Sequence, residues 1–208
     1  MRDKADLYTF EREERQNGNN VICGIDEAGR GPLAGPVYAA AVILNPDDVI
    51  EGLDDSKKLS EKKREALYPE IIKRALSYSV AFATEKEVDG LNILNASMLA
   101  MRRAADGLHI KPDIALIDGN CSKGFTIKVR TIVGGDAKSA SIAAASILAK
   151  VSRDRFMKEL AALYPQYLFD VHKGYPTKKH VELLLKYGPC EVHRRSFLSN
   201  ILNKESAG

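Results

Sequence analysis

The chain has 208 residues, of which 45% are hydrophobic and 28% are charged. This is an ordinary globular composition, and the length suits one large domain with a substantial core, or one domain with a small appendage. The net charge is only +3, so any argument for a polyanionic partner must rest on where the basic residues lie.

Features of secretion, membrane insertion and disulfide bonding are missing from the sequence. Residues 1–20 are charged and lack the apolar core of a secretory signal, and the longest apolar run, Val37–Leu44, is too short to cross a bilayer. Cys23, Cys121 and Cys190 form no Cys-x-x-Cys pair and read as reduced thiols. We therefore expect a cytoplasmic monomer with no membrane partner.

Apolar periodicity divides the chain into strands and helices. In chain order, the expected elements are strands at 21–25 and 37–44, a helix at 60–76, a strand at 77–83, a helical region at 84–107 with a break near Gly90, strands at 114–117 and 125–133, and helices at 139–163, at 178–187 and after Arg195. The first two strands should form a hairpin, and Thr84 with Glu87 forms a capping box. The pattern indicates a layered α/β domain whose C-terminal helices form a small cap.

Acidic residues stand at the expected ends of separate segments. Asp26 and Glu27 end the first strand and open directly into the glycine-rich turn 28–36, Asp118 ends a later strand, and Asp136 lies in a glycine-flanked loop. Because ligands collect at strand ends in α/β sheets, these acids can converge. Oxygen ligands without a neighbouring histidine or cysteine favour Mg²⁺ or Mn²⁺ over zinc. Without metal, repulsion should raise the pKa of at least one of them.

Asp154 competes with Asp136 for the fourth position in this set. If residues 139–163 form one helix, the two acids lie roughly 25 Å apart at about 1.5 Å per residue. They cannot then both hold metal ions that are about 4 Å apart. We favour Asp136 because it lies beside a strand end, whereas Asp154 lies mid-helix between arginines as an ion-pair partner.

Six motifs resemble the type 2 ribonucleases H, specifically the bacterial ribonuclease HII family. Between about Val21 and Phe197 they follow in the family's order as residues 24–37, 55–59, 117–119, 135–139, 142–154 and 172–177. An ordered set is specific, whereas any one piece is weak. The resemblance implies a ribonuclease H-like fold, with a mixed sheet flanked by helices, in a single catalytic domain with a core at 18–190 and a helical tail at 191–208.

The resemblance also implies an activity and a set of functional residues. It implies an endonuclease that hydrolyses the RNA strand of RNA–DNA hybrids and cuts at ribonucleotides embedded in duplex DNA, leaving 5′-phosphate and 3′-hydroxyl ends. The implied catalytic residues, which hold two Mn²⁺ or Mg²⁺ ions, are Asp26, Glu27, Asp118 and Asp136. The positions implied to sense the ribose 2′-hydroxyl are Gly29, Arg30, Gly31 and Tyr175.

Basic residues within the motifs become candidates for phosphate contacts without sequence preference. They are Lys57, Lys58, Lys138 and Lys173. Taken alone, each basic cluster, the Arg194-Arg195 pair among them, is expected to be a solvated face. His172 and His180 are left outside the site as surface or capping residues.

Other functions are weighed against this one. A nucleic-acid-binding protein that has lost catalysis is disfavoured by the complete acidic motifs. A nuclease of the same fold that acts on DNA alone would have no use for a 2′-hydroxyl sensor such as residues 29–31 with Tyr175. A phosphate-binding NTPase is not supported, because no Gly-Lys-Ser/Thr ends the glycine-rich turn.

Overall fold

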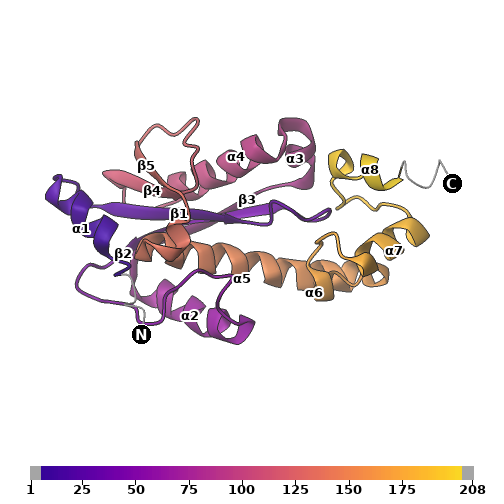
Figure 1. Ribbon diagram of the computed structural model, residues 1–208, viewed down its shortest axis with the longest axis horizontal. Helices are drawn as coiled ribbons and strands as arrows, with labels where there is room; N and C mark the ends of the chain where they lie inside the picture. Colours follow the sequence, from indigo (N-terminus) through magenta and orange to yellow (C-terminus); the bar gives the residue numbers. More distant parts are fainter. Residues whose placement is uncertain (1–5, 203–208) are drawn as a thin grey trace.

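A five-stranded mixed sheet lies between two layers of helices in the computed structural model, which describes residues 6–202 (Figure 1). The strands are β1 (Ile22–Ala28), β2 (Val37–Leu44), β3 (Ala75–Ala83), β4 (Ile114–Asp118) and β5 (Lys128–Ile132). They lie in the order β3-β2-β1-β4-β5. β1, β2 and β3 pair antiparallel, whereas β4 and β5 run parallel to β1. The mixed sheet and the hairpin of its first two strands are confirmed.

Helices cover both faces of this sheet. They are α1 (Thr9–Gln16), α2 (Glu61–Arg74), α3 (Glu85–Leu91), α4 (Ile93–Asp106), α5 (Ala140–Leu163), α6 (Phe169–His172), α7 (Lys178–Tyr187) and α8 (Ser199–Leu202). α4 packs on one face and α5 on the other (Figure 1). Ser60, Thr84 and Ser139 cap α2, α3 and α5 through side-chain oxygens, and the capping box at Thr84 is confirmed. No helix in the described range is long and apolar enough to cross a membrane.

The alternation of side chains along β1 explains where its acids point. Cys23 and Ile25 belong to the core beneath α4, whereas Ile22 packs with Ile142 of α5. Gly24 also faces α5, and a Cβ atom there would lie 2.1 Å from the backbone carbon of Ser141. Since successive residues of a strand point to opposite faces, the residue that follows Ile25 turns its side chain under α5.

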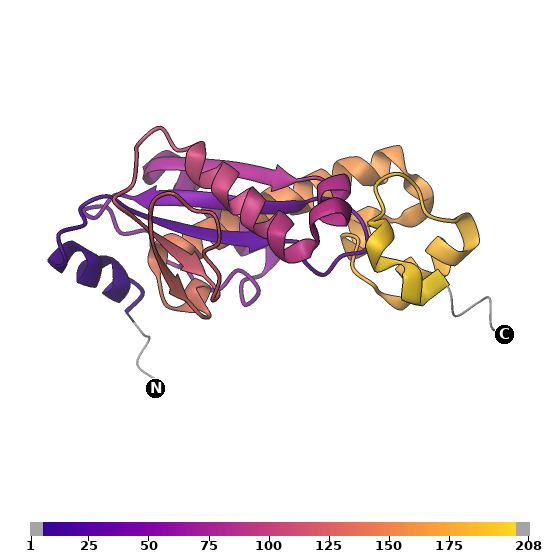
Figure 2. The same cartoon turned by 90° about the horizontal axis from the view of Figure 1, so that it is seen from above.

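The residues after α5 form a small cap at the end of the molecule opposite α1 (Figure 2). Tyr167 and Phe169 stack with their ring centroids 5.3 Å apart, and they pack against Met157 and Leu160 of α5. Burying two aromatic rings on the end of a long helix supplies the cap with its own apolar core. The expected C-terminal helical cap is therefore confirmed.

The apolar pattern did not predict α1, because the face that this helix buries is acidic. Glu11 and Glu14 are both buried. The Glu11 carboxylate accepts hydrogen bonds from the hydroxyl groups of Ser139 and Ser141 and from the Ser141 N–H, at 2.6 to 2.9 Å. Glu14 accepts a 2.8 Å hydrogen bond from Arg130 on β5. α1 is thus attached by polar contacts, which a search for hydrophobic periodicity does not detect.

Smaller differences concern the boundaries of the elements. β1 continues past Ile25 to Ala28, so both of its acids lie within the strand. The break expected near Gly90 is present and occurs at Asn92, which has a φ of 65°. β5 is shorter than the expected run 125–133. The expected C-terminal tail includes residues 203–208, which lie outside the described range.

Candidate active site

Asp26 and Asp118 stand at the same end of two neighbouring strands. β1 and β4 pair in parallel with Ile25 opposite Ile117, so the residues that follow this pair are adjacent. Glu27 is the next residue of β1. The loop after β5 brings in the fourth predicted acid, because the N–H of Gly135 donates a 2.6 Å hydrogen bond to Asp118 Oδ1. The fold therefore gathers the predicted acids at one end of the sheet.

Asp26 is the most deeply buried of these acids, with 3% of its surface exposed. Burial, followed by the charges of Glu27 and Asp118, raises its pKa well above the usual value. The Ser146 side chain on α5 and the Glu27 N–H, which donates a 2.7 Å hydrogen bond to the Asp26 carboxylate, lower this pKa in part. The expectation that repulsion raises the pKa of at least one acid is confirmed.

Glu27 and Asp136 are affected in the same direction. Burial is the largest cause of the raised pKa of Glu27, and the Arg30 guanidinium, 3.4 Å from its carboxylate, offsets part of that shift. Burial and the neighbouring Asp55 raise the pKa of Asp136, while Lys57, at 3.5 Å, lowers it. The acidic end of the sheet therefore holds more negative charge than its own cations neutralise.

This donor set fits a hard divalent cation. All of its members are carboxylates, they repel one another, and an added positive charge between them would relieve that repulsion. Within residues 6–202, no three acidic, histidine or cysteine side chains already surround one point as metal ligands. Binding a shared cation would thus require the carboxylates to turn toward each other, and the four-residue ligand set stays a prediction.

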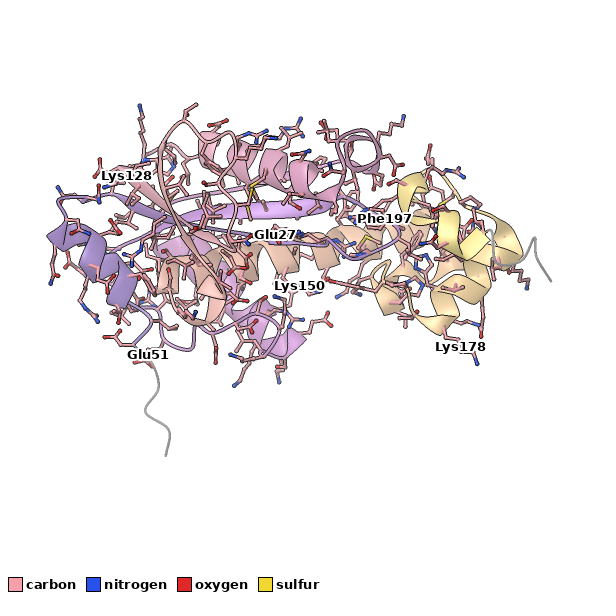
Figure 3. The ribbon with its side chains drawn as sticks, turned by 45° about the horizontal axis from the view of Figure 1, so that its top comes forward. Glu27, Glu51, Lys128, Lys150, Lys178 and Phe197 are labelled. Carbon is pink, nitrogen blue, oxygen red and sulfur yellow. The ribbon has the colours of Figure 1, made fainter. Side chains whose placement is uncertain are left out.

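The predicted 2′-hydroxyl sensors line a cavity of about 310 Å³ that also reaches Glu27. Gly29, Arg30 and Gly31 form one side of it, and Tyr175 forms another. A Cβ atom on Gly31 would lie 3.8 Å from the Tyr175 ring. Tyr175 has 38% of its surface exposed. Glu27, on β1, lies near the middle of the molecule (Figure 3).

The four candidate lysines differ in their surroundings. Lys57 lines the cavity, whereas Lys58 lies near the carboxylates of Asp54 and Asp55. Lys138 donates a 2.7 Å hydrogen bond to the Val133 carbonyl, and Lys173 donates to the Asp170 carbonyl. Of the four, Lys57 alone lines the cavity, and its ammonium group lies 3.5 Å from the Asp136 carboxylate.

Lys150 also lines the cavity, although the sequence analysis did not select it. Its ammonium group lies 5.9 Å from the centre of the Tyr175 ring and donates a 2.7 Å hydrogen bond to Asp154. Lys150 could have been selected from the sequence, because it lies within the motif 142–154, one helical turn after Ser146. The ion pair also confirms that Asp154 is a helix-internal partner of a basic residue.

Two expectations about basic residues are wrong. Arg194 is fully buried rather than part of a solvated face. His172 and His180 are buried in the cap, where their rings stack with centroids 4.2 Å apart, rather than lying on the surface. Backbone carbonyls satisfy all three side chains, and residue type alone does not reveal such long-range partners.

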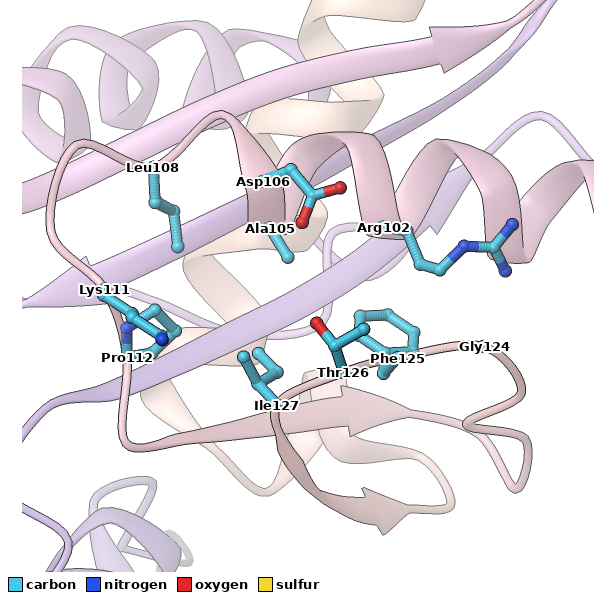
Figure 4. A pocket seen from close by; sticks show the side chains of 10 residues that line it. All are labelled: Arg102, Ala105, Asp106, Leu108, Lys111, Pro112, Gly124, Phe125, Thr126 and Ile127. Carbon is cyan, nitrogen blue, oxygen red and sulfur yellow. The ribbon is translucent and has the colours of Figure 1, made fainter.

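A larger cavity, of about 440 Å³, lies between α4 and the segment before β5 (Figure 4). Leu108, Phe125 and Ile127 supply its apolar lining, and Asp106 is its one acid. It contains none of the predicted site residues. A single carboxylate with Arg102 and Lys111 offers no metal or acid–base constellation, so the smaller cavity beside Glu27 is the better candidate site.

Comparisons with known proteins show the family of this chain. Residues 23–200 match the sequence model of the ribonuclease HII family. Ribonuclease HII of Caldicellulosiruptor bescii is 56% identical over 98% of this chain and 100% of its own length. Ribonuclease HII of Burkholderia vietnamiensis is 59% identical over 86% of this chain and 83% of its own.

Solved structures show the same architecture. Ribonuclease H2 from Pyrococcus horikoshii superimposes with a TM-score of 0.74 at 27% identity, covering 90% of this chain and 99% of its own. Bst-RNase HIII in complex with Mn²⁺ superimposes with a TM-score of 0.72, covering 90% of this chain and 70% of its own, and at 18% identity it supports the fold alone.

The sheet with acids at its strand ends therefore defines a nuclease of the ribonuclease H type. The chain belongs to the ribonuclease HII family, and it is a metal-dependent endoribonuclease. Membership of this family supports ribonuclease H activity on RNA–DNA hybrids.

Proposed function

We propose that this protein cuts at single ribonucleotides embedded in duplex DNA, as well as along the RNA strand of hybrids. The observation that carries the proposal is the shared cavity. Its lining joins Glu27, at the acidic strand ends, to the glycine-rich loop and Tyr175. A phosphodiester beside the acids would thus have its sugar next to a surface that can read the 2′-hydroxyl, which both donates and accepts hydrogen bonds.

The proposed ligands of two Mg²⁺ or Mn²⁺ ions are Asp26, Glu27, Asp118 and Asp136. When bound, such a pair of cations activates a water molecule and stabilises the departing oxygen, which leaves 5′-phosphate and 3′-hydroxyl ends. The hydrogen bonds from the Glu27 N–H to Asp26 and from the Gly135 N–H to Asp118 hold two of the carboxylates in place. A Mn²⁺ complex is described for the fold relative Bst-RNase HIII.

Discrimination between ribose and deoxyribose is assigned to the glycine-rich loop and Tyr175. Gly29 and Gly31 carry no Cβ atom, which lets the backbone approach a sugar closely. Tyr175 offers a ring for sugar packing and a hydroxyl group for hydrogen bonding. The same proposal includes a cytoplasmic location, since Cys23, Cys121 and Cys190 are all free thiols, and a monomer.

The decisive experiment is cleavage of a DNA duplex that carries one ribonucleotide, with Mg²⁺ or Mn²⁺ and with chelator. We expect metal-dependent cutting at the ribonucleotide and none in the all-DNA duplex. Equal cutting of both duplexes would reject the proposal. Tyr175→Ala should reduce the preference for the ribonucleotide substrate, whereas Tyr187→Ala, an exposed tyrosine of the cap, serves as the matched control.

A further inference from the structure

Two arginines are buried where the cap meets the glycine-rich loop. Arg153, on α5, and Arg194, after α7, both have 0% of their surface exposed. Burying a guanidinium group is costly unless its donors are satisfied. The hydrogen bonds of both groups go to backbone carbonyl oxygens. The backbone around these side chains is therefore arranged to receive them.

Arg194 takes most of its acceptors from one short stretch of chain. Its three nitrogens donate to four carbonyl oxygens of the loop, those of Gly29 at 2.7 Å, Arg30 at 3.0 Å, Pro32 at 2.9 Å and Gly35 at 2.8 Å. A planar fork of donors with fixed geometry can satisfy such a set, whereas a single ammonium group cannot span it. The carbonyl groups of the glycine-rich loop thus point toward the Arg194 side chain.

Arg153 supports the same loop from α5. It donates to the carbonyl oxygens of Ala34, Pro36 and Lys173 at 3.0 to 3.1 Å. A Cβ atom on Gly29 would lie 2.0 Å from its Nε atom, so only glycine allows this approach. The loop is therefore held between two fixed guanidinium groups, with Arg194 the one that contacts the carbonyls of Gly29 and Arg30.

The orientation of those carbonyls decides where the next N–H groups point. All peptide bonds in the described range are trans, and in a trans peptide the C=O and the following N–H point in opposite directions. The carbonyls of Gly29 and Arg30 point inward to Arg194, so the N–H groups of Arg30 and Gly31 point away from it. Both residues line the cavity. Within residues 6–202, neither N–H donates a hydrogen bond to a protein acceptor.

We propose that Arg194 is a positioning residue for ribose recognition. By holding the carbonyls of Gly29 and Arg30, it aims the N–H groups of Arg30 and Gly31 at the oxygen atoms of the ribonucleotide, the 2′-hydroxyl in particular. Arg194 itself does not touch the substrate, since it lies behind the loop. This inference rests on the proposed function, because it explains how that function selects ribose.

The test compares the variant Arg194→Lys with a control variant, Arg74→Lys. Arg74 forms an ion pair with Asp48, away from the glycine-rich loop. In chelator, where no cleavage occurs, the dissociation constants of a single-ribonucleotide duplex and an all-DNA duplex give a preference ratio. Loss of two hydrogen bonds of about 1 kcal/mol each should lower that ratio about 10- to 30-fold in Arg194→Lys. The ratio should stay unchanged in Arg74→Lys.

The outcomes separate the two proposals. If the wild-type protein shows no preference for the ribonucleotide, the proposed function fails. If the wild-type protein shows it and a folded Arg194→Lys keeps it, only the role of Arg194 fails. If Arg194 only stabilised the fold, its replacement would weaken binding of both duplexes equally and lower the Tm of the protein. The preference ratio would then stay unchanged. Millimolar guanidinium should restore the ratio in Arg194→Ala, and no rescue would count against the positioning role.

A measurement on the wild-type protein covers the case in which the variants do not fold. Amide hydrogen exchange followed by NMR should show unprotected N–H groups at Arg30 and Gly31 in the free protein. Both should gain protection when the single-ribonucleotide duplex is added, and neither should do so with the all-DNA duplex. Equal protection by both duplexes, or none, would overturn the proposal.

Discussion

The two sides of the candidate site solve opposite electrostatic problems. At the strand ends, buried carboxylates crowd together and their pKa values are raised by burial and by one another. At the cap, Arg153 and Arg194 are buried just as deeply, but carbonyl oxygens satisfy their donors. The carboxylates at the strand ends have too few cations to neutralise them, whereas the guanidinium groups beside the cap have hydrogen-bond acceptors for their donors.

This difference indicates separate tasks. A cluster of carboxylates that destabilises itself gains stability when a cation binds, so it suits reversible metal binding. A loop whose carbonyls are already saturated keeps its shape whether or not a substrate is present, so it suits recognition. The four predictions below test this contrast, beginning with the largest expected effect.

Removing one acid of the cluster should abolish turnover. Asp118→Asn and Asp136→Asn should each lower kcat by more than the roughly 100-fold that loss of an outer-shell partner costs, with duplex binding largely intact. Asp154→Asn is the matched control, since that acid pairs with Lys150 inside α5. Single-turnover cleavage with Mg²⁺ measures the effect, and surviving activity in Asp118→Asn would show that the ligand set is wrong.

The cap should lose stability in acid. Burial lowers the pKa of His180 and of His193 to about 4, from the ordinary 6.5. Between these values the unfolded chain binds protons that the folded cap does not, so the Tm should fall as the pH is lowered from 6.5 to 4. His180→Gln should make this decline shallower, and calorimetry across that range measures it. An unchanged slope would contradict the assignment.

The acidic end should behave in the opposite way. Because folding raises the pKa of Asp26, its contribution to stability is present at low pH and is lost as the pH rises through the folded-state pKa. In chelator at neutral pH, Asp26→Asn should therefore stabilise the protein by about 0.5–2 kcal/mol, in the range of single stabilising substitutions. The exposed Asp47→Asn is the control, and a lower Tm in Asp26→Asn would break the comparison.

The smallest effect is expected from the lysines. Lys57→Ala should weaken duplex binding at low salt and reduce the slope of log affinity against log salt by about 1, as loss of one phosphate contact does. Lys138→Ala should change the slope less, because its ammonium group is bonded to the Val133 carbonyl. Binding titrations at several salt concentrations would measure both slopes. Equal slopes would show that Lys57 and Lys138 do not differ as phosphate contacts.

Most of the strands and helices, and the carboxylate character of the site, could be predicted from the amino-acid sequence. Apolar runs and helical spacing predicted the sheet and the long helix α5, because β2 is buried along its whole length and most of α5 up to Val151 is buried. Carboxylates at strand ends are common in themselves, and these acids could be picked out because they lie in motifs that resemble the ribonuclease HII family, in the order of that family.

The polar contacts that fix the acidic strand ends and the glycine-rich loop could be found only in the folded structure. Glu11 anchors an acidic helix to Ser141, 130 residues away, and Arg194 meets the Gly29 carbonyl across 165 residues. Lys150 enters the cavity only because α5 lies across β1. Such polar side chains look solvated in a sequence, because nothing in it shows which distant donor or acceptor each one meets after folding.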